Sequence, residues 1–250
     1  MQKILGIIFL SFSITYKSFS LDFSLRTNTW NDFQGKLGPY EIQLSLFLFE
    51  NGKIKGNYLY KKNEEKIQLF GHLKNSNVVL TEVIDKSENG FFNGRIFIDD
   101  PDRFEGVWEN KARTNKLNFK LTLKSTSSSP YEFRYANSIY GTTVEVENFV
   151  KDMKNSILNN DRIWISKHIC YPIKVNLNGN KKVINNKKTL LKYYDEIITD
   201  KFKEKIYKYY TTNLFNNWQG VMFGQGEIWI NNTKNSNKKK YDYCIIAINN

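Results

Sequence analysis

The sequence has few of the residues that usually carry chemistry or form covalent scaffolds. Its 250 residues include only two cysteines, two histidines and four prolines. So few cysteines exclude a small disulfide-stapled scaffold, and two cysteines with two distant histidines lack the spacing of a zinc site. With 40% hydrophobic and 25% charged residues, the composition is that of an ordinary globular chain. We therefore expect one or two folded domains, with no metal or cofactor.

Long hydrophobic runs are also absent, apart from one short stretch near the N-terminus. Residues 1–20 begin with an early cation, Lys3, continue with an apolar run from Ile4 to Ile14 and end with small polar residues. That order is typical of a secretory signal peptide, and the run is too short to span a bilayer comfortably. We predict a mature chain that starts at Leu21, is secreted or periplasmic, and does not span a membrane.

Positive charge is in excess and is unevenly distributed. The chain has 37 Lys and Arg against 25 Asp and Glu, a formal net charge of +12. Residues 21–130 have a net charge of +2, whereas residues 131–250 have a net charge of +8. We expect an anionic partner to meet the second half first, although a lysine-rich solvated surface without a function is the alternative.

Between residues 38 and 124, short alternating stretches are separated by turn residues. Ile42, Leu44 and Leu46 share one face of their strand, while Lys53 and Lys55 point away from the apolar face of the next. The pattern predicts seven antiparallel strands, or eight with residues 30–37. Such a meander removes its edges most simply by closing into an up-and-down barrel, with a flattened sandwich as the alternative.

A stretch rich in serine, residues 125–130, predicts an interdomain linker over residues 125–139, after which the hydrophobic period changes to that of helices. We expect an α+β domain over residues 140–250. Its predicted elements are helices at 144–158 and 161–168, a β-hairpin at 171–184, a helix at 185–199, and strands at 221–230 and 241–248. We interpret Gly224-Gln225-Gly226 as a bulge within the first of these two strands.

This order of elements resembles the nuclear-transport-factor-2-like fold, a cone of helices wrapped by a curved sheet that includes ketosteroid isomerases. The stretch from Asn217 to Ile230, a Gly-bent strand that contains Trp229, resembles segments of exported bacterial members. The first half, with Gly56-Asn57-Tyr58 and Gly106-Val107-Trp108 at strand ends, is similar to lipocalin-like and avidin-like barrels. Both resemblances imply a shape that can hold a ligand rather than a particular reaction.

The aromatic and basic residues of the second half supply the candidate binding residues. Asp161 and His168 are about two helical turns apart and would not touch, so we predict no catalytic residue. Lysine runs at 181–182, 187–188 and 238–240, beside Tyr241 and Tyr243, have the composition of a polyanion clamp. The candidate ligand-binding residues are Trp164, His168, Tyr194, Trp218 and Trp229.

The two cysteines, Cys170 and Cys244, both lie in the second half. In an exported protein they are candidates for a disulfide bond, because an oxidising compartment lets such a bond persist. Two buried free thiols on β-strands are the alternative.

From these features we expect a non-enzymatic binding protein of the cell envelope, with a small molecule or polymer in a barrel or cone cavity. One alternative is an envelope inhibitor or immunity protein that acts by protein–protein contact. Another is an enzyme of isomerase or hydrolase type in the C-terminal domain. The expected partner is a small molecule, an anionic envelope component or an exported protein, and not a nucleic acid.

Overall fold

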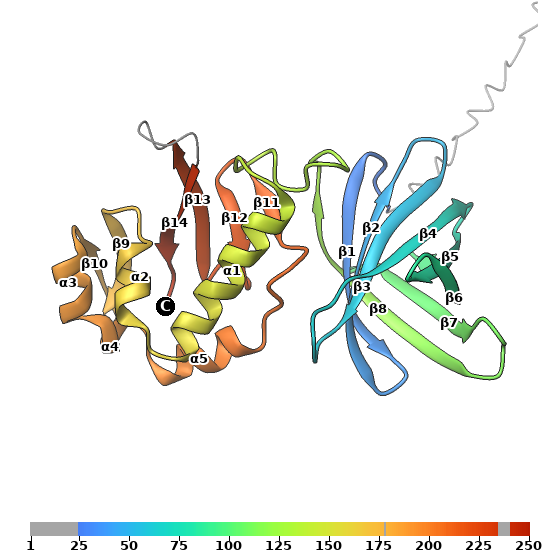
Figure 1. Ribbon diagram of the computed structural model, residues 1–250, viewed down its shortest axis with the longest axis horizontal. Coiled ribbons are helices and arrows are strands. Elements are labelled where there is room, and N and C mark those ends of the chain that lie inside the picture. Colours follow the sequence, from blue (N-terminus) through green and yellow to red (C-terminus); the bar gives the residue numbers. More distant parts are fainter. Residues whose placement is uncertain (1–24, 178, 235–240) are drawn as a thin grey trace, which may run out of the picture.

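The computed structural model describes residues 25–177, 179–234 and 241–250. The chain forms two bodies that lie side by side, a β-barrel from the first half and an α+β part from the second (Figure 1). The predicted signal peptide and the lysine run at 238–240 lie outside the described residues. None of the described helices is long and apolar enough to cross a membrane.

The first half is a closed antiparallel barrel in which each strand pairs with the next and β8 pairs back with β1. The predicted barrel is therefore confirmed and the sandwich alternative is wrong. Its eight strands are β1 (Thr29–Leu37), β2 (Tyr40–Leu48), β3 (Lys53–Tyr60), β4 (Ile67–Lys74), β5 (Asn77–Ile84), β6 (Ser87–Phe97), β7 (Arg103–Asn110) and β8 (Lys116–Ser127).

Large side chains fill the barrel lumen. Ile42, Leu44 and Leu46 are fully buried, as their alternation predicts. Phe104 and Phe119 lie with ring centroids 4.7 Å apart, and further buried aromatic rings extend this contact on both sides. Since these aromatic rings pack with buried aliphatic side chains in one cluster, the lumen is a hydrophobic core.

One carboxylate, Glu82, lies buried among these lumen side chains. Its Oε2 accepts hydrogen bonds from the Tyr58 hydroxyl at 2.7 Å and from Trp108 Nε1 at 2.8 Å, and its Oε1 accepts one from Asn89. Burial and the Glu82 charge both raise the pKa of Tyr58 above its ordinary value. Because both carboxylate oxygens have donors, Glu82 is a satisfied polar group inside the hydrophobic lumen.

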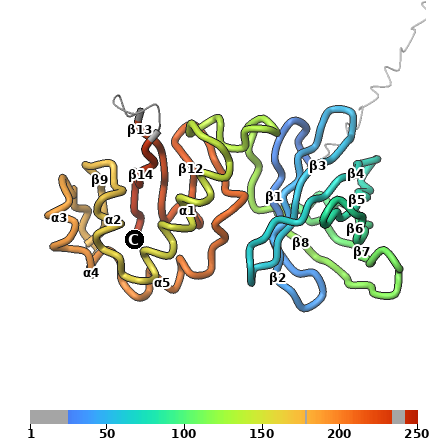
Figure 2. The backbone as a smooth tube through the Cα atoms, in the orientation of Figure 1, coloured from blue at the N-terminus to red at the C-terminus, as the bar shows by residue number. Residues whose placement is uncertain are grey.

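The predicted linker is wrong at its start, because Ser125–Ser127 continue β8 and pair with β1. The following residues lead to the α+β part, as the backbone trace shows (Figure 2). Its elements are α1 (Thr143–Leu158), α2 (Arg162–Lys167), β9 (Ile173–Leu177), β10 (Asn180–Ile184), α3 (Lys187–Lys192), α4 (Tyr194–Ile197), α5 (Asp200–Tyr207), β11 (Phe215–Asn217), β12 (Gly220–Phe223), β13 (Ile228–Lys234) and β14 (Tyr241–Ile248).

Two predicted elements of this part need correction. The single helix predicted at 185–199 is two short helices, α3 and α4, and α5 follows them where we predicted no helix. The strand predicted at 221–230 is a hairpin, in which Phe223 of β12 pairs with Ile228 of β13. Gly224 and Gly226 have φ of 75° and 105°, a conformation that glycine adopts readily, so this stretch turns the chain instead of forming a bulge.

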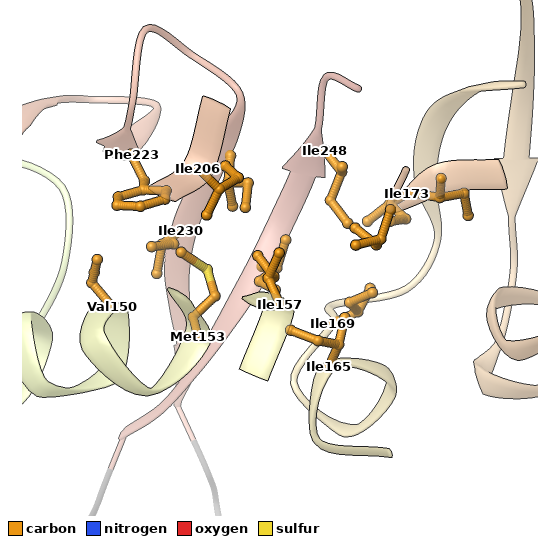
Figure 3. Close-up of a cluster of buried hydrophobic side chains, with 14 of the residues drawn as sticks. Val150, Met153, Ile157, Ile165, Ile169, Ile173, Ile206, Phe223, Ile230 and Ile248 are labelled. Atoms are coloured by element: carbon orange, nitrogen blue, oxygen red, sulfur yellow. The ribbon is translucent and has the colours of Figure 1, made fainter. Parts of the chain in front are cut away.

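The core of the α+β part lies between α1 and the β11–β14 sheet. Thr142 and Glu145 form a capping box that starts α1. The helix then directs Val150, Met153 and Ile157 toward Phe223 and other buried residues of the sheet and of α5 (Figure 3). This apolar interior is where the expected cone would hold a ligand.

A disulfide bond joins Cys170 to Cys244, so the disulfide alternative describes the structure and the free-thiol alternative does not. Beside it, the Ile245 amide donates to the His168 carbonyl at 2.7 Å and the Cys170 amide donates to the Ile245 carbonyl at 2.9 Å. The bond thus fastens the segment after α2 to strand β14.

Candidate functional site

The junction between the two parts is polar and almost completely buried. Arg134, which is 2% exposed, donates from Nη2 to both oxygens of Asp32 at 2.8 Å and from Nη1 to Ser45 Oγ at 2.8 Å. Burial lowers the pKa of Arg134, but the Asp32 carboxylate outweighs this effect and holds the pKa above its ordinary value. A buried pair of this geometry fixes the position of the barrel relative to the α+β part.

A second group of buried contacts lies beside the first. Glu147 of α1 accepts hydrogen bonds from the Tyr135 hydroxyl at 2.9 Å and from the Asn213 amide at 3.0 Å. Its other oxygen lies 2.6 Å from Nζ of Lys66, which follows β3. Glu64 accepts from the backbone and the hydroxyl of Thr211 at 2.8 and 2.6 Å. Residues from both parts therefore hold one another in place.

A cleft of about 860 Å³ opens along this junction. The barrel contributes residues 61–64 and Lys66, α1 contributes a row of residues from Val144 to Asn155, and the end of α5 with the segment after it closes the third side. Six lysines and three glutamates line it. They are Lys61, Lys62, Lys66, Lys151, Lys154 and Lys208, with Glu41, Glu64 and Glu147.

Half of these lysines are paired inside the cleft. Lys66 pairs with Glu147, and Lys61 lies 3.3 Å from Glu64. Lys154 donates to the Tyr209 carbonyl at 2.5 Å and lies 3.8 Å from the same Glu64. The other three, Lys62, Lys151 and Lys208, are exposed and form no ion pair within the part of the chain that the structure describes.

Two of the paired lysines have pKa values below the ordinary value of lysine, because burial disfavours their charged form. Burial, together with the neighbouring Lys61 charge, lowers the pKa of Lys154 to about 8. Burial also lowers the pKa of Lys66, against the opposing effect of Glu147. The hydroxyl oxygen of Thr212 on the cleft wall has no hydrogen-bond partner among the described residues. An anion bound here would supply both the missing counter-charge and an acceptor for that hydroxyl.

None of the five residues predicted from the sequence lines this cleft. Trp164 and His168 stack with ring centroids 3.9 Å apart, the one pair that the structure brings together, and His168 Nδ1 lies 2.8 Å from the Trp164 carbonyl. Asp161 caps α2 through the Trp164 amide at 2.9 Å, which is a structural role.

The other three predicted residues lie apart from one another. Tyr194 is fully buried in the core, with the Arg162 guanidinium 5.0 Å from its ring centroid. Trp229 is half-buried opposite Met222 in the sheet. Trp218, which is 82% exposed, lies in the turn between β11 and β12. These side chains do not form one ligand site.

Two pairs of lysines in the sequence could have indicated the cleft, but we did not predict a site from them. Lys61 and Lys62 follow a barrel strand, and Lys151 and Lys154 are three residues apart, so the latter two lie on the same side of the predicted helix. The approach of the two pairs depends on the packing of the two parts, which no local pattern reports.

No protein-family model matches this chain, and no curated protein matches its sequence. Among the described residues, no group of three or more His, Cys, Asp and Glu side chains is placed to hold a metal ion.

Proposed function

We propose that this chain is an exported binding protein of the cell envelope that holds an anionic ligand in the cleft between its two parts. The ligand is a small molecule, or a segment of a polymer, that bears phosphate or carboxylate groups. One observation carries the proposal: six lysines from both parts converge on one cleft, three of them exposed and without an ion pair in the described chain.

The cleft supports a binding role better than the two interiors do. Aromatic rings fill the barrel lumen, and apolar side chains from α1, α5 and the sheet fill the space inside the α+β part. For this reason we place the ligand outside the barrel and cone cavities that the resemblances imply. Helices over one face of a four-stranded sheet support the proposal that the α+β part is nuclear-transport-factor-2-like.

Calorimetric titration of residues 21–250 with pyrophosphate tests the proposal. We expect saturable binding that a double variant, Lys151→Gln with Lys208→Gln, weakens about tenfold, since each lysine contributes on the order of 0.5–1 kcal/mol to a partly exposed charged contact. The matched control is Lys74→Gln with Lys86→Gln, which removes the same charge from exposed positions on the barrel. Equal weakening in both variants would show that only net charge matters and would refute the cleft as the site.

Protein–protein contact is the second candidate function, and Trp218 is the observation that favours it. An exposed tryptophan at the end of a hairpin is the kind of side chain that anchors interfaces. Native mass spectrometry of the protein purified gently from its own exported fraction tests this candidate. A second protein in fixed ratio, lost in a Trp218→Ala variant, would support it, whereas a bound small mass would support the cleft.

A further inference from the structure

A second hollow, of about 450 Å³, lies at the same junction and shares no lining residue with the basic cleft. Its barrel wall comes from the outward face of β1, β2 and β8. Its other walls are Tyr209 and Tyr210 after α5 and the residues Phe215 and Met222 of the β11–β14 sheet. The volume is in the range of sites for small organic ligands.

The hollow differs from the cleft in its charge. Its acidic residue, Asp32, is neutralised by the bidentate contact with Arg134. Its lysine, Lys124, is exposed at the barrel surface. The remaining polar side chains of the wall are amides and hydroxyls, so the hollow suits an uncharged ligand.

Two lining residues keep buried acceptors without partners. Gln43, which is 4% exposed, donates from Nε2 to the Asn213 carbonyl at 3.4 Å, while its Oε1 has no hydrogen-bond partner among the described residues. Asn213, which is 2% exposed, donates from Nδ2 to Asn57 Oδ1 at 2.8 Å, and its Oδ1 is likewise unpaired. Rotation of the Gln43 amide would turn its oxygen toward the Asn213 carbonyl, which can only accept, so Gln43 cannot remove its mismatch in this way. Leaving a buried acceptor unpaired is costly, so each such group calls for an explanation.

We propose that this hollow binds an uncharged, polyhydroxylated group, a neutral sugar residue. Hydroxyl groups donate to the oxygens of Gln43 and Asn213, and the apolar face of the sugar ring lies against the tyrosine rings. A peptide fits less well, because its backbone N–H groups point in fixed directions, whereas a sugar ring offers several hydroxyl groups whose hydrogens rotate to meet a fixed acceptor. This site is independent of the anion that we propose for the cleft.

Gln43→Met is the first test variant, because it removes the unpaired oxygen and keeps a side chain of similar length. Asn213 is a poorer choice, since its backbone is left-handed with φ of 49°, which strains most substitutions. Gln34→Trp is the second variant. It fills the hollow from a half-buried position on β1, where an aromatic residue suits a strand. The matched control is Gln68→Met, at an exposed position on β4.

The measurement is saturation-transfer NMR of residues 21–250 with maltotriose, chitotriose and blocked trialanine, together with urea unfolding. We expect transfer to at least one sugar, with binding about tenfold weaker in Gln43→Met, lost in Gln34→Trp and unchanged in Gln68→Met. We also expect each variant to unfold in urea as a folded protein does. Transfer to the peptide alone, transfer to neither sugar, or full sugar binding by Gln43→Met would overturn the proposal. Urea unfolding checks that each variant is folded, since Gln43→Met also loses the Nε2 hydrogen bond to the Asn213 carbonyl. Pyrophosphate titration of the same sample reports on the cleft separately.

Discussion

Removing the charge of Arg134 is the sharpest test of how the two parts are joined. In an Arg134→Met variant, the Asp32 carboxylate stays buried but loses both of its 2.8 Å hydrogen bonds to the guanidinium. It keeps hydrogen bonds from the hydroxyls of Ser45 at 2.6 Å and Ser125 at 3.1 Å. Breaking a buried ion pair by removing one partner costs about 3–5 kcal/mol, because it leaves an uncompensated charge. We expect the variant to lose an amount in that range from its free energy of unfolding.

Urea unfolding followed by tryptophan fluorescence measures this loss, since Trp30 lies 4.7 Å from the guanidinium. A further Asp32→Asn change removes the orphaned charge, so the double variant is expected to be more stable than Arg134→Met alone. The control is Arg26→Met, which removes an exposed arginine near the start of β1. A loss below about 1 kcal/mol, the value of an exposed pair, would refute the claim that this contact joins the two parts.

Three further predictions concern the cleft and the disulfide. Pyrophosphate affinity should be fully present below pH 8 and should fall as the pH rises through about 8, because Lys154 loses its proton there; calorimetry from pH 6 to 9 checks this, and a Lys154→Met variant should lose that step. Burial raises the pKa of Glu64, but hydrogen bonds from Thr211 and nearby lysine charges outweigh it and leave the pKa below its ordinary value. The stability from Glu64 should therefore be present at neutral pH and disappear as the pH falls through that lowered pKa, so urea midpoints of the wild type and Glu64→Gln should converge in acid. Replacing Cys170 and Cys244 by serine should cost about 4 kcal/mol in the chain-entropy account, given a sequence separation of 74; a urea midpoint equal to that of the disulfide-bonded protein would contradict it.

Local patterns were sufficient to predict most of the fold. Alternation at Ile42, Leu44 and Leu46 predicted the lumen face, because a strand repeats every two residues and one face must be buried. The predicted bulge at Gly224 and Gly226, in contrast, was wrong. Glycine accepts positive φ in a bulge and in a turn alike, so the sequence does not distinguish them without knowledge of the strand pairing.

The buried junction beside the cleft was not predicted, because its barrel residues belong to the face that alternation assigns to solvent. Asp32, Ser45 and Asn57 alternate with lumen residues and read as exposed polar positions, yet all three are buried. What covers them is the second part of the chain, through Arg134 and Asn213. A pattern of period two reports which face of a strand is apolar, and it contains no information about a polar face that another domain covers.

This buried polar face explains why the ligand sites are expected at the junction. Contacts between polar groups require specific partners at specific distances, so the barrel and the α+β part meet in one relative position. The segments that carry the cleft lysines are therefore held in place before any anion arrives, and less conformational freedom is lost on binding than at a hinge between mobile domains. If Arg134→Met loosens this junction, pyrophosphate affinity should fall even though Arg134 does not line the cleft. Unchanged affinity in a folded Arg134→Met variant would show that the cleft does not depend on the junction for its shape.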